Sequence, residues 1–522
     1  MSVSPSLDAV LFDMDGVVTD TATAHAAAWK RLFDDFLAER SERTGEAFEP
    51  FDIDKDYRPY VDGKPRHDGI RSFAEARGIA LPEGSEADGP DVETVHGLGK
   101  RKQGYFEAWL RENRAPVYPG TIALIERLRG QGVKTGLFTS SRNAEAVLAN
   151  AGLTGLFESR VDGNDLAELG SAGKPDPAML LEAARRLGSD PVRTAVLEDA
   201  LSGVKAGHRG GFGFVVGVAR GDYADDLVGA GADVVIGDVA ELRVEGRRLE
   251  VKTLANLPSV WHREEEIRAR LAGVKPVVFL DYDGTLTPIV EDHTKAIISE
   301  EMRAAVASLS RSLKVAIVSG RDLTMLRRLI DLDTVYLAGS HGFEIAAPDG
   351  SIENLEMGTE FLPELNAAES ELKTRLADID GHSVERKRFS VAVHYRLVAE
   401  SDVEKLDAIV RDVMNAHPRL VRGYGKKVFE IQPGIDWNKG RAVGWLLEAL
   451  ALDRPDILPI YIGDDLTDEH AFRALAGRGL TVVVRDADPR STAADYAVAD
   501  VDEVSRLLSM LAQFAGNGGD RK

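Results

Sequence analysis

The pattern of apolar and polar positions repeats one feature in two parts of the chain. Residues 9–12 and 277–280 are apolar runs, and each continues into Asp-x-Asp-Gly, at 13–16 and 281–284. A short apolar run before a glycine turn predicts a buried strand. Packing gives no reason for two carboxylates at its end, because desolvating them is costly without a partner. Mg²⁺ is such a partner, since it takes oxygen ligands, and parallel sheets bind ligands at the carboxyl ends of their strands.

Three later segments of the first half also place polar groups after an apolar run or in a turn. They are the hydroxyls Thr139 and Ser140 after the predicted strand 133–138, Lys174 in a Gly-Lys-Pro turn, and the acidic pair Glu198 and Asp199 after residues 195–197. A hydroxyl in this position either donates to a phosphate or caps the next helix. Taken together in this order, the groups have complementary chemical roles in phosphoryl transfer. One aspartate can attack phosphorus, a second can protonate the leaving oxygen, and the others can offset phosphate charge or hold Mg²⁺.

The second half repeats this order. Its members are Ser319, Gly320 and Arg321 after the strand 314–318, Lys439 in an Asn-Lys-Gly turn, and Asp464 and Asp465 after the strand 459–462. The repeated order predicts two phosphoryl-transfer units in tandem.

The spacing of these groups differs between the halves. The long interval lies before the hydroxyl in the first half, where it is 126 positions, and after the hydroxyl in the second half, where it is 120. We therefore expect extra domains, or caps, at about 21–115 and about 343–432. The predicted domains are 1–245 and 271–522, with a linker and packed helix at 246–270.

Composition narrows the class of protein. The chain has 522 residues, 44% of them apolar, and a formal charge of −22, which argues against binding to nucleic acid or an anionic membrane. The absence of cysteine excludes disulfides and thiol catalysis. No run of 18 uncharged apolar residues occurs, and residues 1–7 lack the pattern of a signal peptide. We expect a cytoplasmic enzyme.

The ordered motifs resemble the haloacid dehalogenase superfamily of phosphatases and mutases. The resemblance implies an α/β fold with two Rossmann-like cores, each a parallel sheet with helices on both faces. It also implies a helical cap inserted after the first strand of the first core. In the second core, an α+β cap is expected between the serine and lysine motifs.

The second half resembles trehalose-6-phosphate phosphatases over about 274–510, through DYDGTLTPI, VSGR, GSHGFE, VAVHYR, GKKVFEIQP, NKGRAV and YIGDDLTDE. The resemblance implies that Asp281 is the nucleophile and Asp283 the general acid/base. The implied phosphate-binding residues are Ser319, Gly320, Arg321 and Lys439. The implied sugar-facing residues are Gly342, Glu344, His394, Arg396, Lys426 and Glu430. The implied Mg²⁺ site comprises Asp281, the Asp283 carbonyl, Asp464 and Asp465, with Asp468 nearby.

The first half resembles β-phosphoglucomutase and related phosphatases over about 8–235, most specifically through FDMDGVVTDTATAHAAAWK. The resemblance implies that Asp13 is the nucleophile and Asp15 the acid/base. It implies substrate or phosphate contacts from His25 at the cap hinge, Arg66, Thr139, Ser140 and Lys174. The implied Mg²⁺ residues are Asp13, Asp15, Glu198 and Asp199. Arg142 stands where the family has lysine, and the stretch 41–68 is longer and more polar than the usual cap.

These observations lead us to expect a Mg²⁺-dependent trehalose-6-phosphate phosphatase that works through an aspartyl-phosphate. Its partners are small-molecule sugar phosphates, and the sequence leaves the oligomeric state open. The first half is a mutase, a phosphatase or an inactive structural partner, or it carries the principal activity. A sugar-phosphate sensor without catalysis is a separate alternative, which the intact nucleophiles at both sites disfavour.

Overall fold

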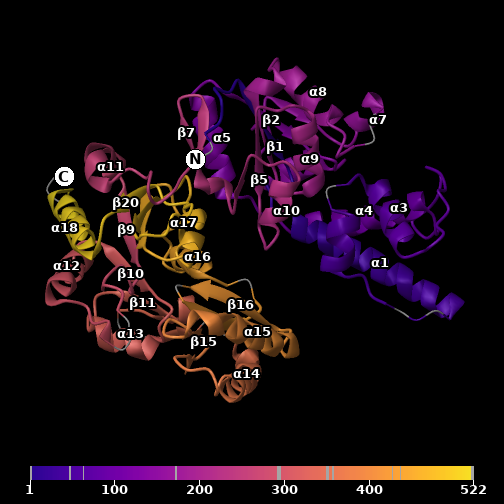
Figure 1. The fold of residues 1–522 in the computed structure, drawn as a ribbon. Helices are drawn as coiled ribbons and strands as arrows, with labels where there is room; N and C mark the ends of the chain where they lie inside the picture. The colour runs from indigo at the N-terminus through magenta and orange to yellow at the C-terminus, as the bar shows by residue number, and fades with distance from the viewer. Residues whose placement is uncertain are drawn as a thin grey trace. The chain divides into compact units, whose positions relative to one another are not determined.

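The computed structural model divides the chain into two compact units, Met1–Val251 (unit 1) and Lys252–Lys522 (unit 2) (Figure 1). Each unit has its own sheet and its own cap. The structure describes residues 3–45, 47, 49–62, 64–170, 173–290, 295–348, 352–354, 358–425, 427–435 and 437–518.

The core of unit 1 is a six-stranded sheet in the order β3-β2-β1-β4-β5-β6, in which all neighbours pair parallel. In chain order the strands are β1 (Ala9–Asp13), β2 (Lys134–Phe138), β3 (Ser159–Val161), β4 (Thr194–Glu198), β5 (Phe214–Val218) and β6 (Val234–Ile236). The helices of this core are α5 (Pro119–Gly130), α6 (Ala144–Ala151), α7 (Asp165–Leu169), α8 (Ala178–Leu187), α9 (Leu201–Arg209) and α10 (Ala224–Gly229). The predicted parallel α/β core is confirmed.

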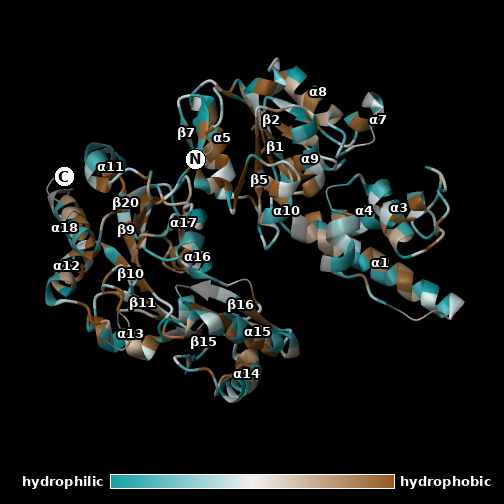
Figure 2. Cartoon of the chain, viewed as in Figure 1, coloured by the Kyte–Doolittle hydropathy of each residue, from teal (hydrophilic) through white to brown (hydrophobic). Residues whose placement is uncertain are grey.

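The central strand β1 is apolar on both faces because each face packs on a separate core. Val10 and Phe12 join one cluster with residues of α5 and α6, whereas Ala9 and Leu11 join another with residues of α8 and α9. Successive side chains of a strand point to opposite faces, so a strand covered on both sides has no polar alternation. In Figure 2 the strands of the sheet are mainly brown, and the helices alternate between brown and teal.

The cap of unit 1 is helical and follows β1. It contains α1 (Ala22–Thr44), the π-helical turn η1 (Ile53–Tyr57), α2 (Arg58–Tyr60), α3 (Arg66–Ala76) and α4 (Val95–Glu112). Trp29, Phe33 and Phe36 lie on one side of α1 and pack with Phe73 and Leu98 in the core of the cap. Their spacing of four and three is that of one helix face.

The core of unit 2 is an eight-stranded sheet in the order β13-β12-β11-β10-β9-β18-β19-β20. The strands are β9 (Lys275–Leu280), β10 (Lys314–Val318), β11 (Tyr336–Gly339), β12 (Glu344–Ala346), β13 (Ile352–Asn354), β18 (Ile457–Gly463), β19 (Leu480–Val484) and β20 (Tyr496–Val498). The pairs β11–β12 and β12–β13 are antiparallel, and the others are parallel. The helical elements are η4 (Val260–Arg263), α11 (Glu264–Leu271), α12 (Glu300–Ser310), α13 (Leu323–Ile330), η6 (Ser340–Gly342), α16 (Lys439–Ala449), α17 (Glu469–Ala474) and α18 (Val501–Gly518).

The cap of unit 2 is an antiparallel sheet, β14-β15-β17-β16, with two helices. Its elements are η7 (Thr359–Phe361), α14 (Leu362–Arg375), β14 (Ser383–Arg386), β15 (Val391–His394), α15 (Glu400–Ala416), β16 (Leu420–Gly425) and β17 (Val428–Pro433). On β17, Phe429 and Ile431 enter the core of the cap. Glu430 lies between them in the strand and lines a pocket on the opposite face.

The interval 246–270 is folded and divides between the units. The hairpin of β7 (Leu242–Glu245) and β8 (Arg248–Val251) belongs to unit 1. Residues from Lys252 onwards belong to unit 2, where Ile267 and Leu271 of α11 join the core.

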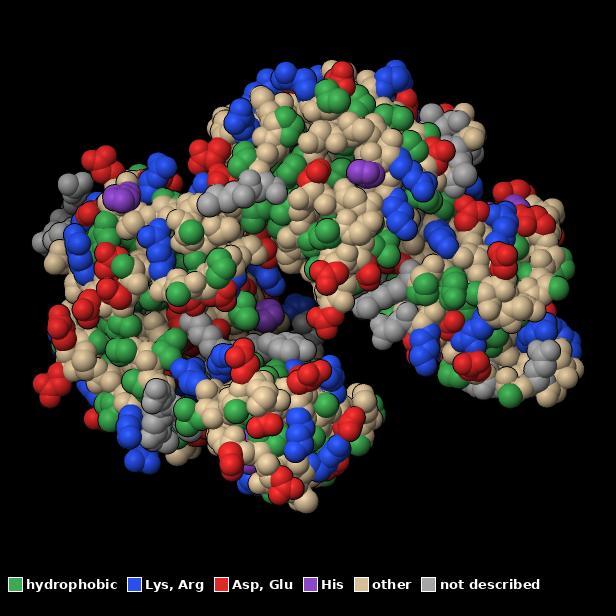
Figure 3. All heavy atoms as spheres, viewed as in Figure 1, with side chains coloured by type: hydrophobic (Ala, Val, Ile, Leu, Met, Phe, Trp, Pro, Cys, Tyr) green, Lys and Arg blue, Asp and Glu red, His purple; other side chains and the backbone are tan. Residues whose placement is uncertain are grey.

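Charge and hydropathy of the described residues add two observations. Acidic and basic side chains are interspersed over the face seen in Figure 3. None of the helices in the described part of the chain combines the length and apolarity needed to cross a membrane.

Candidate active sites

In unit 1, the ends of two neighbouring strands bring an aspartate, a lysine and a glutamate together. Lys174 Nζ donates to Asp13 Oδ1 at 2.5 Å and to Glu198 Oε2 at 2.8 Å. All three side chains are buried. Because β1 and β4 are parallel neighbours, Asp13 and Glu198 lie at the same edge of the sheet.

Three carboxylates of unit 1 could hold a metal ion. Oxygens of Asp13, Glu198 and Asp199 lie within 4.8 Å of one another. Burial, and then the charge of Glu198, raise the pKa of Asp13 to about 7, and burial likewise raises the pKa of Asp199. A bound cation would lower both pKa values. The site is closely built: a Cβ on Gly16 would lie 1.7 Å from Asp199 Oδ2, so only glycine fits there. Hard oxygen donors fit Mg²⁺.

Asp15, the predicted acid/base, lies beside this carboxylate group but is not a member of it. It accepts a hydrogen bond from Thr21 Oγ1, and His25 Nε2 lies 3.7 Å from its Oδ1. Burial, and then the charge of Asp13, raise the pKa of Asp15 to about 6. A pKa in this range suits the predicted role of Asp15 as general acid/base.

Sequence reasoning missed Lys102, which lies behind His25. Its Nζ is 2.6 Å from His25 Nδ1. Burial keeps the pKa of His25 well below its usual value, so the ring is neutral and its Nδ1 accepts from Lys102. That bond leaves the ring proton on Nε2, which faces Asp15. Burial, and then Arg66, lower the pKa of Lys102 to about 7. A lysine within a helix has no local signal in the sequence.

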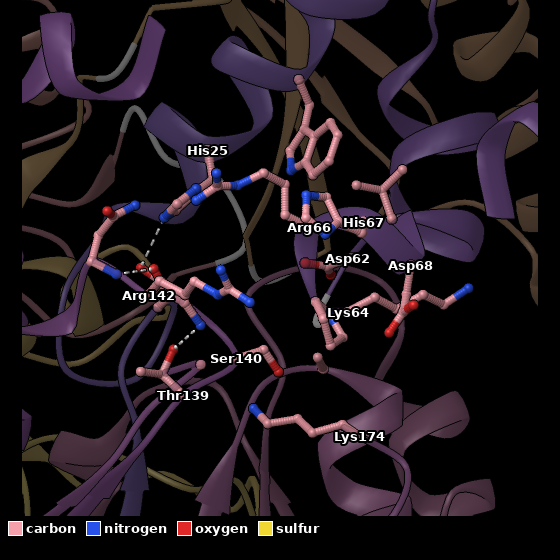
Figure 4. Close-up of a pocket in the computed structure, with 18 of the residues that line it drawn as sticks. His25, Asp62, Lys64, Arg66, His67, Asp68, Thr139, Ser140, Arg142 and Lys174 are labelled. Atoms are coloured by element: carbon pink, nitrogen blue, oxygen red, sulfur yellow. Dashed lines mark hydrogen bonds and ion pairs between the residues drawn. The ribbon is translucent and has the colours of Figure 1, made fainter. Parts of the chain in front are cut away.

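A cavity of about 370 Å³ separates the cap from the core in unit 1. Figure 4 shows the side chains that enter it from the cap, among them Lys64, Arg66 and His67, and those from the core, among them Thr139, Ser140, Arg142 and Lys174. Arg66 is the predicted substrate contact. It donates to Gly99 O at 3.2 Å and to Gln103 Oε1 at 2.5 Å. Burial lowers the pKa of Arg66 to about 10, at which it is still cationic at neutral pH.

Unit 2 repeats the lysine arrangement. Asp281 follows β9 directly, and Lys439 begins α16. Lys439 Nζ donates to Asp281 Oδ1 at 2.6 Å and to Asp468 Oδ1 at 2.7 Å. The side chain of Asn438 accepts from Arg441 N and caps α16, which fixes the start of the helix.

Oxygens of Asp281, Asp464 and Asp468 lie within 4.8 Å of one another. Asp468 accepts from Lys439, from the Tyr461 hydroxyl at 2.7 Å, and from the backbone of residues 464 and 465. These donors outweigh burial and hold the pKa of Asp468 below its usual value. Asp468 therefore anchors the lysine and the loop. Burial raises the pKa of Asp281, and a cation would reverse this.

Glycine again makes room for the acidic group in unit 2. A Cβ on Gly284 would lie 2.2 Å from Asp464 Oδ2. The donor set of Asp281 and Asp464 thus has the oxygen chemistry and close approach that fit Mg²⁺. Asp465 lines the pocket but is not a member of the carboxylate group.

The predicted general acid/base of unit 2 is held by an arginine. Arg321 donates to both oxygens of Asp283, from Nε at 2.7 Å and from Nη2 at 2.6 Å. Asp283 is likewise not a member of the group of three carboxylates. Ser319 is buried at the end of β10, and its Oγ accepts from Arg321 N.

Cap residues line the other side of a pocket of about 280 Å³ in unit 2. Glu430 Oε1 accepts from Lys387 Nζ at 2.9 Å and from Ser390 Oγ at 2.8 Å. These contacts and His341 outweigh burial and hold the pKa of Glu430 well below its usual value. His394, also predicted to bind sugar, lies 2.8 Å from Glu385 Oε2, and Arg396 lines the same pocket. Sequence reasoning missed Lys387 and His341, because each contacts Glu430 from a distant position in the sequence.

Two predicted sugar-facing residues lie outside the pocket lining. Glu344 is buried and accepts from Ser340 Oγ at 3.2 Å and Arg388 Nη1 at 2.8 Å. A Cβ on Gly342 would lie 2.3 Å from Ala442 Cβ, so this glycine permits close packing. Both residues support the loop at η6. Lys426 lies outside the described residues.

Comparison with known proteins follows this division into two units. The family model described as "Trehalose-phosphatase" matches residues 279–502, and the one described as "haloacid dehalogenase-like hydrolase" matches residues 7–211. Over 511 residues the chain is 41% identical to an uncharacterized glycosyl hydrolase of Mycobacterium tuberculosis, covering 97% of this chain and 38% of that protein. The chain therefore spans well under half the length of that relative.

Two further relatives each correspond to a known kind of enzyme. A beta-phosphoglucomutase of Mycobacterium bovis is 49% identical over 237 residues, which cover 45% of this chain and 90% of that protein. A trehalose-phosphate phosphatase of Mycobacterium leprae is 34% identical over 407 residues, which cover 75% of this chain and 92% of that protein.

Two sheets, one parallel and one mainly parallel, each carry an aspartate pair, a lysine and late acids at one edge, and they define a tandem of haloacid dehalogenase-like units. The chain belongs to the beta-phosphoglucomutase family through its first unit and to the trehalose-phosphate phosphatase family through its second. The resemblance seen in the sequence is confirmed.

Proposed function

We propose that unit 2 is a Mg²⁺-dependent phosphatase that converts trehalose 6-phosphate and water to trehalose and phosphate. The observation that carries the proposal is the placement of Asp281. Asp281 accepts a hydrogen bond from Lys439 and lies beside Asp464. It lines a pocket that is also lined by the cap residues Glu430, Lys387 and His394. Asp281, Lys439 and Asp464 suit a phosphate with a bound cation. The cap residues offer the acceptors and donors that sugar hydroxyls require.

The proposed reaction has two steps. An oxygen of Asp281 attacks phosphorus, the bond to the sugar oxygen breaks, and an aspartyl-phosphate forms. Asp283 first gives a proton to the leaving oxygen and then takes one from the water that hydrolyses the aspartyl-phosphate. When bound, Mg²⁺ on Asp281 and Asp464 supplies neutralisation of the phosphate charge. In the structure both oxygens of Asp283 accept from Arg321, and each keeps a second lone-pair site through which a proton can pass to the leaving oxygen.

For unit 1 we propose a sugar-phosphate mutase that uses Asp13 as nucleophile and Asp15 as acid/base. The supporting observation is a second set of cations, Arg66 and Arg142, in the same cavity as the Asp13–Lys174 pair. A mutase must hold a second phosphate while it transfers the first, and a phosphatase has no such need. Phosphatase chemistry with the same residues is the competing proposal.

The test is phosphate release from trehalose 6-phosphate with Mg²⁺ by the wild type, Asp281→Asn and Asp13→Asn. We expect Asp281→Asn to lose at least about 10³-fold in kcat, because it lacks the nucleophile. Asp13→Asn serves as the matched control and keeps wild-type release. Loss in Asp13→Asn alone would assign the reaction to unit 1. No release by the wild type would overturn the substrate assignment.

A further inference from the structure

His341 touches both the core and the cap of unit 2. In the core it contacts Ser319 and Gly320 of residues 319–321, here called the phosphate loop. Its backbone N donates to Ser319 O at 2.8 Å, and Ser340 N donates to Arg321 O at 2.7 Å. A Cβ on Gly320 would lie 2.8 Å from the His341 ring, so the ring lies directly against the backbone of the phosphate loop.

The other side of the same ring contacts the cap. His341 Nε2 lies 2.9 Å from Glu430 Oε2 on β17. Because Glu430 is ionised, Nε2 carries the proton and donates it. The two side chains are 13% and 12% exposed, so little water competes for this bond.

The backbone places the ring between these two contacts. Ser340 has φ 50° and His341 has φ 57°, so both are in the left-handed region without being glycine. Such residues persist only where the surrounding structure holds them, and they concentrate at functional sites. An extended backbone at these positions would direct the ring elsewhere.

We propose that His341 is a positioning residue that couples occupancy of the phosphate loop to the orientation of Glu430 in the cap. A phosphate that fixes Gly320 also fixes the ring packed on it, and the ring fixes the carboxylate. Coupling is reciprocal, so a group bound at Glu430 strengthens phosphate binding by the same factor. The proposal rests on the proposed function only for the identity of the sugar.

The kinetic test combines His341→Asn and Glu430→Gln in a double-mutant cycle, with two substrates. We expect each single variant to lose on the order of tenfold in kcat/KM for trehalose 6-phosphate. The double variant should lose clearly less than the product of the two single losses, because the single variants share the His341–Glu430 contact. Hydrolysis of p-nitrophenyl phosphate, which has no sugar, should change by less than about twofold. Additive losses, or equal loss with both substrates, would overturn the coupling.

A second test needs no sugar. Orthovanadate with Mg²⁺ should slow amide hydrogen exchange in the segment 428–433 of the wild type, and this protection should be absent in His341→Asn. The matched control is His417→Asn, since His417 also lies by two glutamates of the cap, Glu364 and Glu371, away from the pocket. It should retain protection. Protection that persists in His341→Asn, or is absent from the wild type, would overturn the coupling. This test decides it even if trehalose 6-phosphate is not the substrate.

Discussion

Lys174 and Lys439 take the same position in the two units. Each donates to the first aspartate of its Asp-x-Asp pair and to an acid at or just after the end of a neighbouring strand. Burial alone would lower the pKa of each lysine, but the paired carboxylates outweigh it and raise both. Each lysine therefore stays charged and holds the proposed nucleophile, Asp13 or Asp281, in place.

The buried aspartates predict a pH-dependent requirement for metal. Burial raises the pKa of Asp13 from its ordinary value of 3.8 to about 7, and it also raises the pKa of Asp281. Stability from such groups is complete below the unfolded pKa and is lost as the pH rises through the folded pKa. In EDTA we therefore expect Tm to fall by roughly 5 °C or more between pH 5 and pH 8.

Mg²⁺ should reverse this loss, raising Tm more at pH 8 than at pH 5, because a cation binds the ionised carboxylates. Thermal unfolding followed by circular dichroism measures the effect. Asp13→Asn and Asp281→Asn are the controls, since each removes one titrating group and should flatten the dependence. A Tm in EDTA that rises from pH 5 to pH 8 would contradict the argument.

At the scale of elements, a glycine turn follows the aspartate pair at each candidate site. The glycine after each aspartate pair has a positive φ, +85° at Gly16 and +86° at Gly284. Because glycine has no Cβ, a carboxylate can occupy the space beside it, Asp199 in unit 1 and Asp464 in unit 2. One glycine thus meets the needs of both the turn and the close-packed carboxylates that could hold a metal ion. This double role explains why the strand-end motif predicts the site so directly.

Replacing Gly284 by Ala should therefore disable unit 2. Its Cβ would overlap Asp464 Oδ2 and displace a proposed Mg²⁺ ligand. We expect kcat/KM for trehalose 6-phosphate to fall by roughly a hundredfold, about 3 kcal/mol, with a higher Mg²⁺ requirement. Gly444→Ala is the matched control, because nothing lies within 4 Å of its Cβ. In the middle of α16 alanine should be neutral or stabilising. Mg²⁺ titrations of both variants decide the point.

The sequence predicts the elements that have a local pattern of residues, but not the contacts that form only when distant segments fold together. The predicted strand ends at Asp13 and Asp281 are confirmed, because apolar runs and turns are local patterns. The contact of Lys102 with His25 spans 77 positions and that of Glu430 with His341 spans 89, so no spacing rule reaches them. Glu344 is predicted to face sugar, whereas in the structure it begins β12, is buried and accepts hydrogen bonds from Ser340 and Arg388.

At the scale of the whole molecule, the two units share a core plan and differ in the cap. Helices follow β1 in unit 1, whereas a sheet with two helices precedes α16 in unit 2. Because cap residues line the pocket in each unit, different caps on similar cores favour different substrates. This supports separate reactions for the two units.

Each unit should fold and act by itself when the chain is divided at the right peptide bond. That bond joins Val251 to Lys252. Lys252 is buried and donates to Ala493 O at 2.8 Å and Ala494 O at 2.9 Å, so it belongs to unit 2. We expect the fragment 252–522 to unfold cooperatively and to release phosphate from trehalose 6-phosphate at the rate of the full chain.

A fragment that begins at residue 272 is the informative comparison. It lacks Lys252 and the whole of α11, whose Ile267 and Leu271 are fully buried in the core of unit 2. Losing one such side chain costs about 2–5 kcal/mol, and a domain has roughly 5–15 kcal/mol in total. The shorter fragment should therefore be unfolded or have a much lower urea midpoint. Equal stability of the two fragments would show that residues 252–271 are not part of the folded core of unit 2.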